Sequence, residues 1–83
     1  MKYDTRMLVY PEGDTQEIGW QLRFNQLVDV AGRPLAIPVP TVRMIAYRVR
    51  RISNEETRNE HVTRYFLEQL FPDELAAYTS DGT

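Results

Sequence analysis

The alternation of residue types in RMIAYRVRRI, residues 43–52, constrains the fold more than any other feature of the sequence. On a helix, Arg48 would fall inside the apolar arc, where a guanidinium is poorly solvated. On a strand, Tyr47 and Val49 share one face, because successive side chains point to opposite sides. Arg48 and Arg50 then share the other face. We therefore predict a strand here, which leaves no charge at the centre of its apolar face.

Other short segments carry strand and turn signals. Residues 5–10, TRMLVY, are rich in β-formers and are followed by the turn-forming cluster PEGD. Residues 20–24 alternate between apolar and polar types, which also favours a strand. Ala31 and Gly32 precede Arg33-Pro34, and a glycine at this position favours a tight turn.

The proline-rich segment from Pro34 to Pro40 lacks the P-x-x-P spacing of docking peptides. Each proline favours an extended conformation in the residue before it, so we expect Ile37 and Val39 to be extended and to project the same way. The segment is predicted to be a connecting loop or an edge segment that packs these two aliphatic side chains.

The segment from Ser53 to Phe71 has two interpretations. Ser53 and Glu56 fit a capping box, which would start a helix that runs to Phe71. Alternatively, residues 53–60 form a hairpin loop and residues 61–70 form a strand. We favour the hairpin, because it gives the arginine-rich strand a neighbour with carboxylates by the shortest connection.

These patterns predict a single small globular domain over residues 1–78 and a flexible tail over residues 79–83. The predicted fold is mainly β (β-rich α+β), with a small antiparallel sheet or SH3-like barrel of about four to five strands. Residues 72–78 add a short C-terminal helix, with Pro72 suited to its first position. A chain of 83 residues without cysteine has a small core and no disulfide, so close packing or oligomerisation must stabilise it.

Catalytic and metal-binding signals are weak. His61 is the only histidine, and a catalytic triad would need Ser53 or Ser80 beside it. The carboxylate pairs at residues 55–56 and 73–74 lie in solvated polar stretches, which do not favour a general acid. One histidine without cysteine does not suffice for the usual zinc site. We therefore expect no enzymatic activity, no cofactor and no metal.

Arginine is concentrated in one part of the chain. Residues 33–64 contain seven arginines and three glutamates, whereas the rest contains three basic and nine acidic residues. Arginine binds phosphates and stacks on aromatic rings, so the strand at residues 43–51 is a candidate nucleic-acid-binding surface. The net charge of −2 and the isoelectric point near 5.3 argue against that function, which we retain as the alternative.

The function we favour is a non-enzymatic interaction or structural module that binds a protein partner or itself. Arginine, tyrosine, tryptophan and methionine are enriched at interface centres, although a single tryptophan also suits a core. The sequence has neither a signal peptide nor an apolar stretch that could span a membrane, so we expect no membrane association and a cytoplasmic location. The candidate partner-binding residues are Trp20, Met44, Tyr47, Arg48 and Arg50.

Overall fold

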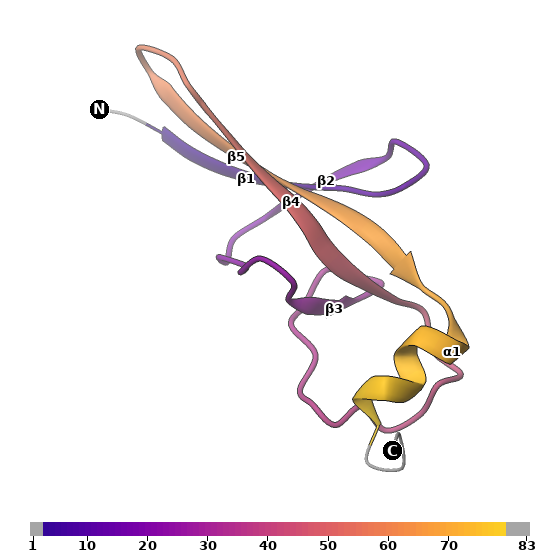
Figure 1. Ribbon diagram of the computed structural model, residues 1–83. Helices are drawn as coiled ribbons and strands as arrows, with labels where there is room; N and C mark the ends of the chain where they lie inside the picture. Colours follow the sequence, from indigo (N-terminus) through magenta and orange to yellow (C-terminus); the bar gives the residue numbers. More distant parts are fainter. Residues whose placement is uncertain (1–2, 80–83) are drawn as a thin grey trace.

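A five-stranded sheet and a short C-terminal helical segment make up the protein (Figure 1). The computed structural model describes residues 3–79. The strand order is β2-β1-β5-β4-β3, and the sheet curls into a half-barrel. The predicted mainly β fold with a short C-terminal helix is confirmed. The elements are β1 (Tyr3–Val9), β2 (Thr15–Ile18), β3 (Leu27–Asp29), β4 (Ala46–Glu56), β5 (Glu60–Leu70), α1 (Pro72–Leu75) and η1 (Ala76–Tyr78).

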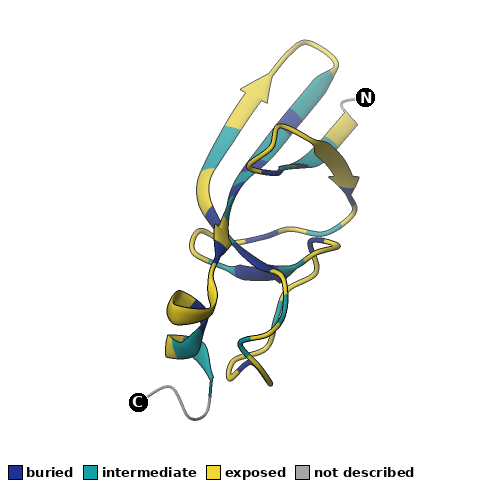
Figure 2. Cartoon of the chain, turned by 90° about the vertical axis from the view of Figure 1, so that its right-hand side faces the viewer, coloured by how far each residue is buried: buried dark blue, intermediate teal, exposed yellow. Residues whose placement is uncertain are grey.

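Strands β4 and β5 form a long antiparallel hairpin, with 11 residues in each strand. The predicted hairpin is confirmed, and the alternative helix is excluded. The loop is shorter than predicted, because Ser53–Glu56 continues β4. These polar residues stay paired with β5 because their side chains form bonds across the hairpin. One such bond joins Glu55 of β4 to Arg64 of β5 at 2.9 Å. Figure 2 shows the exposed residues at this end of the hairpin, and residues 54–59 are all exposed.

A β-bulge interrupts β4 between Val49 and Arg51. The extra residue shifts the alternation, so Arg51 leaves the face on which strict alternation from Tyr47 would place it. Its guanidinium lies 4.1 Å from the centre of the Phe66 ring. The strand is correctly predicted, but it begins at Ala46 and its pattern changes at the bulge.

The strand predicted at residues 20–24 is wrong, because this segment crosses between opposite edges of the sheet. It connects β2 and β3, which are the two edge strands, and so it cannot remain paired within the sheet. The alternating pattern of residues 20–24 does not reflect strand pairing, because its apolar residues are not all buried on one face. Leu22 is buried and its N–H donates to the Tyr65 hydroxyl at 3.2 Å, whereas Phe24 is 62% exposed.

Two hydrophobic clusters lie on opposite faces of the sheet. The adjacent residues Leu27 and Val28 of β3 belong to different clusters, as expected when successive strand residues point to opposite faces. The first cluster, here the inner cluster, contains Leu8, Tyr10, Ile18, Leu22, Val28, Tyr47, Val49, Tyr65 and Leu67. The second, the outer cluster, contains Leu27, Val39, Ala46, Leu70 and Leu75, and so it includes the buried residue of α1.

The proline-rich segment is a connecting loop, as predicted, but only one of its two aliphatic side chains packs. Val39 is 2% exposed, whereas Ile37 is 61% exposed. Val39 also bridges to Thr79, and its N–H donates to the Tyr78 carbonyl at 2.8 Å. Thr79, which the predicted tail included, is therefore part of the fold, and residues 80–83 of that tail lie outside the described residues.

The predicted turn at Ala31-Gly32 is confirmed, and Gly32 adopts a positive φ of 85°. Asp29 Oδ1 accepts the N–H groups of Ala31 and Arg33, both at 2.9 Å. The Gly32 carbonyl accepts the Trp20 Nε1–H at 3.0 Å. The Asp29 bonds hold the turn together, and the Trp20 bond attaches the crossover segment to it.

Candidate functional site

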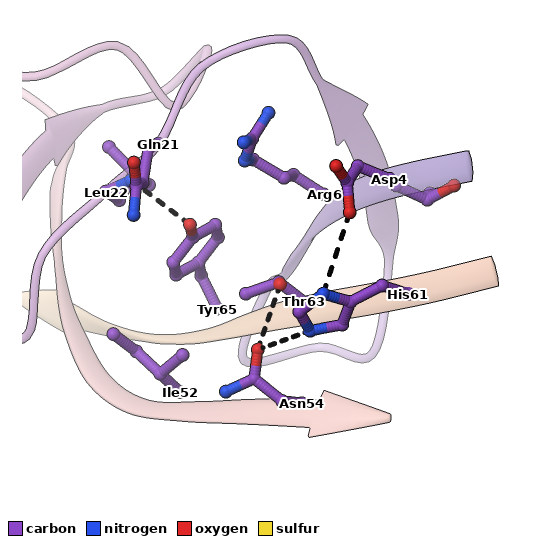
Figure 3. A pocket seen from close by; sticks show the side chains of 10 residues that line it. Asp4, Arg6, Gln21, Leu22, Ile52, Asn54, His61, Thr63 and Tyr65 are labelled. Carbon is purple, nitrogen blue, oxygen red and sulfur yellow. Dashed lines mark hydrogen bonds and ion pairs between the residues drawn. The ribbon is translucent and has the colours of Figure 1, made fainter. Parts of the chain in front are cut away.

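A pocket of about 350 Å³ opens on the face of the sheet that carries the inner cluster (Figure 3). This volume lies at the small end of the range for ligand sites, about 300–1,000 Å³. The strand register explains its composition, because residues opposite one another share a face. Asp4 lies opposite His61, and Arg6 lies opposite Thr63. The polar side chains in the lining belong to Asp4, Thr5, Arg6, Gln21, Asn54, His61 and Thr63.

Tyr65, Leu22 and Ile52 form the apolar part of the pocket. Tyr65 is 2% exposed, and its hydroxyl oxygen accepts the Leu22 N–H at 3.2 Å. A tyrosine hydroxyl also has a hydrogen to donate, and none of residues 3–79 accepts it. In Figure 3 a dashed line joins this hydroxyl to Leu22. The crossover segment thus closes one side of the pocket and leaves one donor available there.

A polar network fixes the orientation of His61. Asn54 Oδ1 accepts from Thr63 Oγ1 at 3.1 Å and lies 3.1 Å from His61 Nε2. Because an amide oxygen can only accept, this contact assigns the hydrogen to Nε2. His61 Nδ1 lies 3.6 Å from Asp4 Oδ1. The imidazole is therefore held between an amide and a carboxylate.

This network does not have the geometry of a Ser-His-acid triad. In such a triad the free imidazole nitrogen faces the nucleophilic hydroxyl, whereas here it faces an amide oxygen. Ser53 pairs with Arg64, one position out of step with the Asn54–Thr63 pair, so Ser53 points to the opposite face. Ser80 lies outside the described residues.

Arg6 contributes the positive charge in the pocket. It is half-buried on β1, and it lines the pocket together with Gln21, Leu22 and Tyr65 (Figure 3). Within residues 3–79, no carboxylate forms an ion pair or a hydrogen bond with it. The Asp4 carboxylate, two residues earlier, is the one that approaches His61.

Two of the predicted partner-binding residues belong to the interior on the inner-cluster side. Trp20 is half-buried and packs against the inner cluster. Tyr47 is 6% exposed, and its ring meets that of Tyr10 edge to face at 5.3 Å between centroids. Burial raises the pKa of both hydroxyls, Tyr10 and Tyr47, above the ordinary value of 10.0. Both tyrosines are therefore neutral at physiological pH.

The other three predicted residues lie elsewhere. Met44 is half-buried against the outer cluster, and Arg50 is exposed at the bulge. Arg48 donates through Nε to Glu68 at 2.9 Å and through Nη1 to the Tyr78 hydroxyl at 3.3 Å. The hydrogen bond to Glu68 is the main cause that raises the pKa of Arg48. The structure does not bring the five predicted residues together, and none of them lines the pocket.

Replacing Glu68 with glutamine is expected to lower the free energy of unfolding by about 1 kcal/mol, because a half-buried charged pair becomes a weaker neutral contact. The two side chains are 29% and 35% exposed. Glu55→Gln is the matched control, since its pair with Arg64 is 38% and 58% exposed and should contribute less than about 0.5 kcal/mol. Urea unfolding measures both variants. If both variants lost the same free energy of unfolding, the greater burial of the Arg48–Glu68 pair would make no contribution to stability.

The pocket was not predicted from the sequence, although part of its signal is visible there. Asp4 and Arg6 lie two residues apart on β1, and His61 and Thr63 are spaced in the same way on β5. What brings them together is the parallel pairing of β1 with β5. That pairing joins strands that are far apart in the sequence, so no local pattern could reveal it.

Among residues 3–79, no three histidine, cysteine, aspartate or glutamate side chains gather as a metal site would require. In the same part of the chain, no helix has the length and apolar character needed to cross a membrane.

Comparisons with curated proteins and with solved structures returned no match. A protein-family model does match, and it covers residues 3–78, which is nearly the whole chain. The chain therefore belongs to the family described as "Uncharacterised Treponema protein".

Proposed function

We propose that this protein is a non-enzymatic binding module that recognises a polypeptide segment of a protein partner at the pocket. The observation that carries the proposal is the convergence of polar groups from β1, the crossover segment and the β4–β5 hairpin on one small pocket. Within the described residues, the Arg6 charge and the Tyr65 hydroxyl hydrogen are not used by the fold itself.

The mixed lining of the pocket supports a polypeptide as the ligand. Leu22 and Ile52 offer apolar contacts, and Gln21 and Asp4 offer hydrogen-bonding groups beside them. A polypeptide presents the same mixture, since apolar side chains alternate with backbone N–H and C=O groups. The orientation of His61 towards Asn54 supports binding in preference to nucleophilic catalysis.

The arginine contacts favour a protein partner over a nucleic acid. Arg48 is bonded to Glu68, Arg64 is bonded to Glu55, and Arg51 lies over an aromatic ring. Arginines that are already paired with carboxylates release few counterions on binding a phosphate backbone. The cytoplasm remains the proposed compartment.

A peptide library displayed on phage tests the proposed function. Selection on the immobilised protein is expected to enrich related sequences, and Arg6→Gln should reduce their binding. Arg51→Gln, on the opposite face of the sheet, is the matched control and should leave binding unchanged. Failure to enrich any sequence would contradict the proposal, and so would binding that is equally strong in the Arg6→Gln variant.

Two further measurements test self-association and nucleic-acid binding, the alternatives to a separate protein partner. Sedimentation at raised concentration tests whether a second copy of the chain is the partner. Titration with single-stranded and duplex oligonucleotides at low salt is expected to show no binding. Affinity for an oligonucleotide that falls steeply with salt would instead support the nucleic-acid function.

A further inference from the structure

We infer that the pocket binds a carboxylate group of its ligand between the Arg6 guanidinium and the Tyr65 hydroxyl. This inference rests on the proposed function, because it names the chemical group that the partner presents. Three features of residues 3–79 support it: a cation that no anion pairs with, a buried donor without an acceptor, and an acidic side chain in the same pocket lining.

The first feature is Arg6. The residue is half-buried, and within residues 3–79 no carboxylate is paired with its guanidinium. Removing a cation from water is unfavourable unless an anion and hydrogen bonds replace the lost solvation. A planar guanidinium with parallel N–H groups matches a carboxylate, which accepts two of them at once. A ligand carboxylate would therefore be stabilised by Arg6.

The second feature is Tyr65. Its side chain is 2% exposed, and its oxygen already accepts the Leu22 N–H. This bond fixes the position of the hydroxyl, so that its hydrogen is the part left for a ligand. A hydroxyl that donates to a carboxylate forms a charge-assisted bond, which is stronger than a bond between neutral groups. Tyr65 thus supplies a second donor in the pocket that Arg6 also lines (Figure 3).

The third feature is Asp4, whose negative charge favours a singly charged ligand group over a more highly charged anion. Its carboxylate lines the same pocket and lies 3.6 Å from His61 Nδ1. A phosphate dianion would meet this negative charge with one arginine to balance it, whereas a carboxylate carries a single charge. Leu22 and Ile52 suit the carbon atoms next to a carboxylate. The lining therefore favours a monoanion with an apolar neighbour.

Two sources in a polypeptide offer this chemistry, a free C-terminus and an acidic side chain. Three probes distinguish them by ¹H–¹⁵N NMR titration of the labelled protein: N-acetyl-Ala-Val with a free carboxylate, the same compound as its amide, and N-acetyl-Glu-amide. We expect saturable shifts of the Arg6, Leu22 and Tyr65 signals with at least one of the two carboxylates. The N-acetyl-Ala-Val amide should cause none.

Variants test the two donors. Arg6→Gln should weaken binding of the carboxylate probe by at least about tenfold, the effect of losing one charge-assisted hydrogen bond. Tyr65→Phe should weaken it by about fivefold, and the ¹H–¹⁵N spectrum shows whether the variant is still folded. Arg51→Gln removes an arginine from the other face and should bind as the unaltered protein does.

The outcomes separate the inference from the proposed function. Equal binding of the amide and carboxylate probes would overturn the inference, and so would unchanged affinity in the Arg6→Gln variant. Library peptides that bind at the pocket without any carboxylate would overturn the inference and leave the proposed function standing. Carboxylate probes that bind at Arg6 while no library peptide is enriched would support the inference and contradict the proposed function.

Discussion

Replacing Gly32 with alanine is expected to destabilise the protein by about 2–4 kcal/mol, because the new methyl group meets two obstacles at once. The backbone at Gly32 has a φ of 85°, which is strained for any residue with a Cβ. An added Cβ would also overlap Leu8 Cδ1, and Leu8 is fully buried in the inner cluster. Leu8 would have to move within a closely packed core.

Two other glycines serve as controls for the Gly32 variant. Gly13 has a φ of 99° with nothing within 4 Å of an added Cβ, so Gly13→Ala measures backbone strain alone and should cost about 1–2 kcal/mol. Gly19 has open space and no positive φ, so Gly19→Ala should be almost neutral. Urea unfolding gives the three values. Equal losses at Gly13 and Gly32 would show that the contact with Leu8 contributes nothing.

The parts of the fold that were predicted correctly rest on local patterns. Tyr47 and Val49 alternate with arginine and are buried, because an apolar face of period two can be covered only if the segment is a strand. Pro72 begins the short helix, since proline needs no hydrogen bond at that position. Such patterns act within a few residues, so the sequence shows them directly.

The incorrect predictions concern where a segment lies in the sheet. Residues 20–24 alternate as a strand does, but their neighbours β2 and β3 lie at opposite edges, so the chain must cross over. The consecutive residues Arg50 and Arg51 do break the alternation, but the pairing of β4 with β5 is what identifies this break as a bulge. The pocket depends on the parallel pairing of β1 and β5, which involves residues such as Arg6 and Thr63. These features are set by contacts between distant segments, and composition alone does not encode them.

Replacing Leu75 with alanine is expected to lower the free energy of unfolding by about 2–4 kcal/mol. Leu75 is fully buried in the outer cluster, where it is the buried residue of α1. A helix of four residues has no stability of its own in water, so its position depends on side-chain packing. The loss should appear in urea unfolding. Amide exchange at Val39 should also become faster, because its N–H is bonded to Tyr78 beyond the helix.

Phe71→Ala is the matched control for Leu75→Ala, because it removes a larger side chain at the start of the same helix. Phe71 is 55% exposed, so its loss should cost less than about 1 kcal/mol. If the two variants lost the same free energy of unfolding, packing of Leu75 in the outer cluster would not be what holds the helix in place. If Leu75→Ala accelerated exchange at Val39 but left Leu8 unchanged, the two clusters would unfold separately. A common change at both sites would show that the sheet couples the clusters on its two faces.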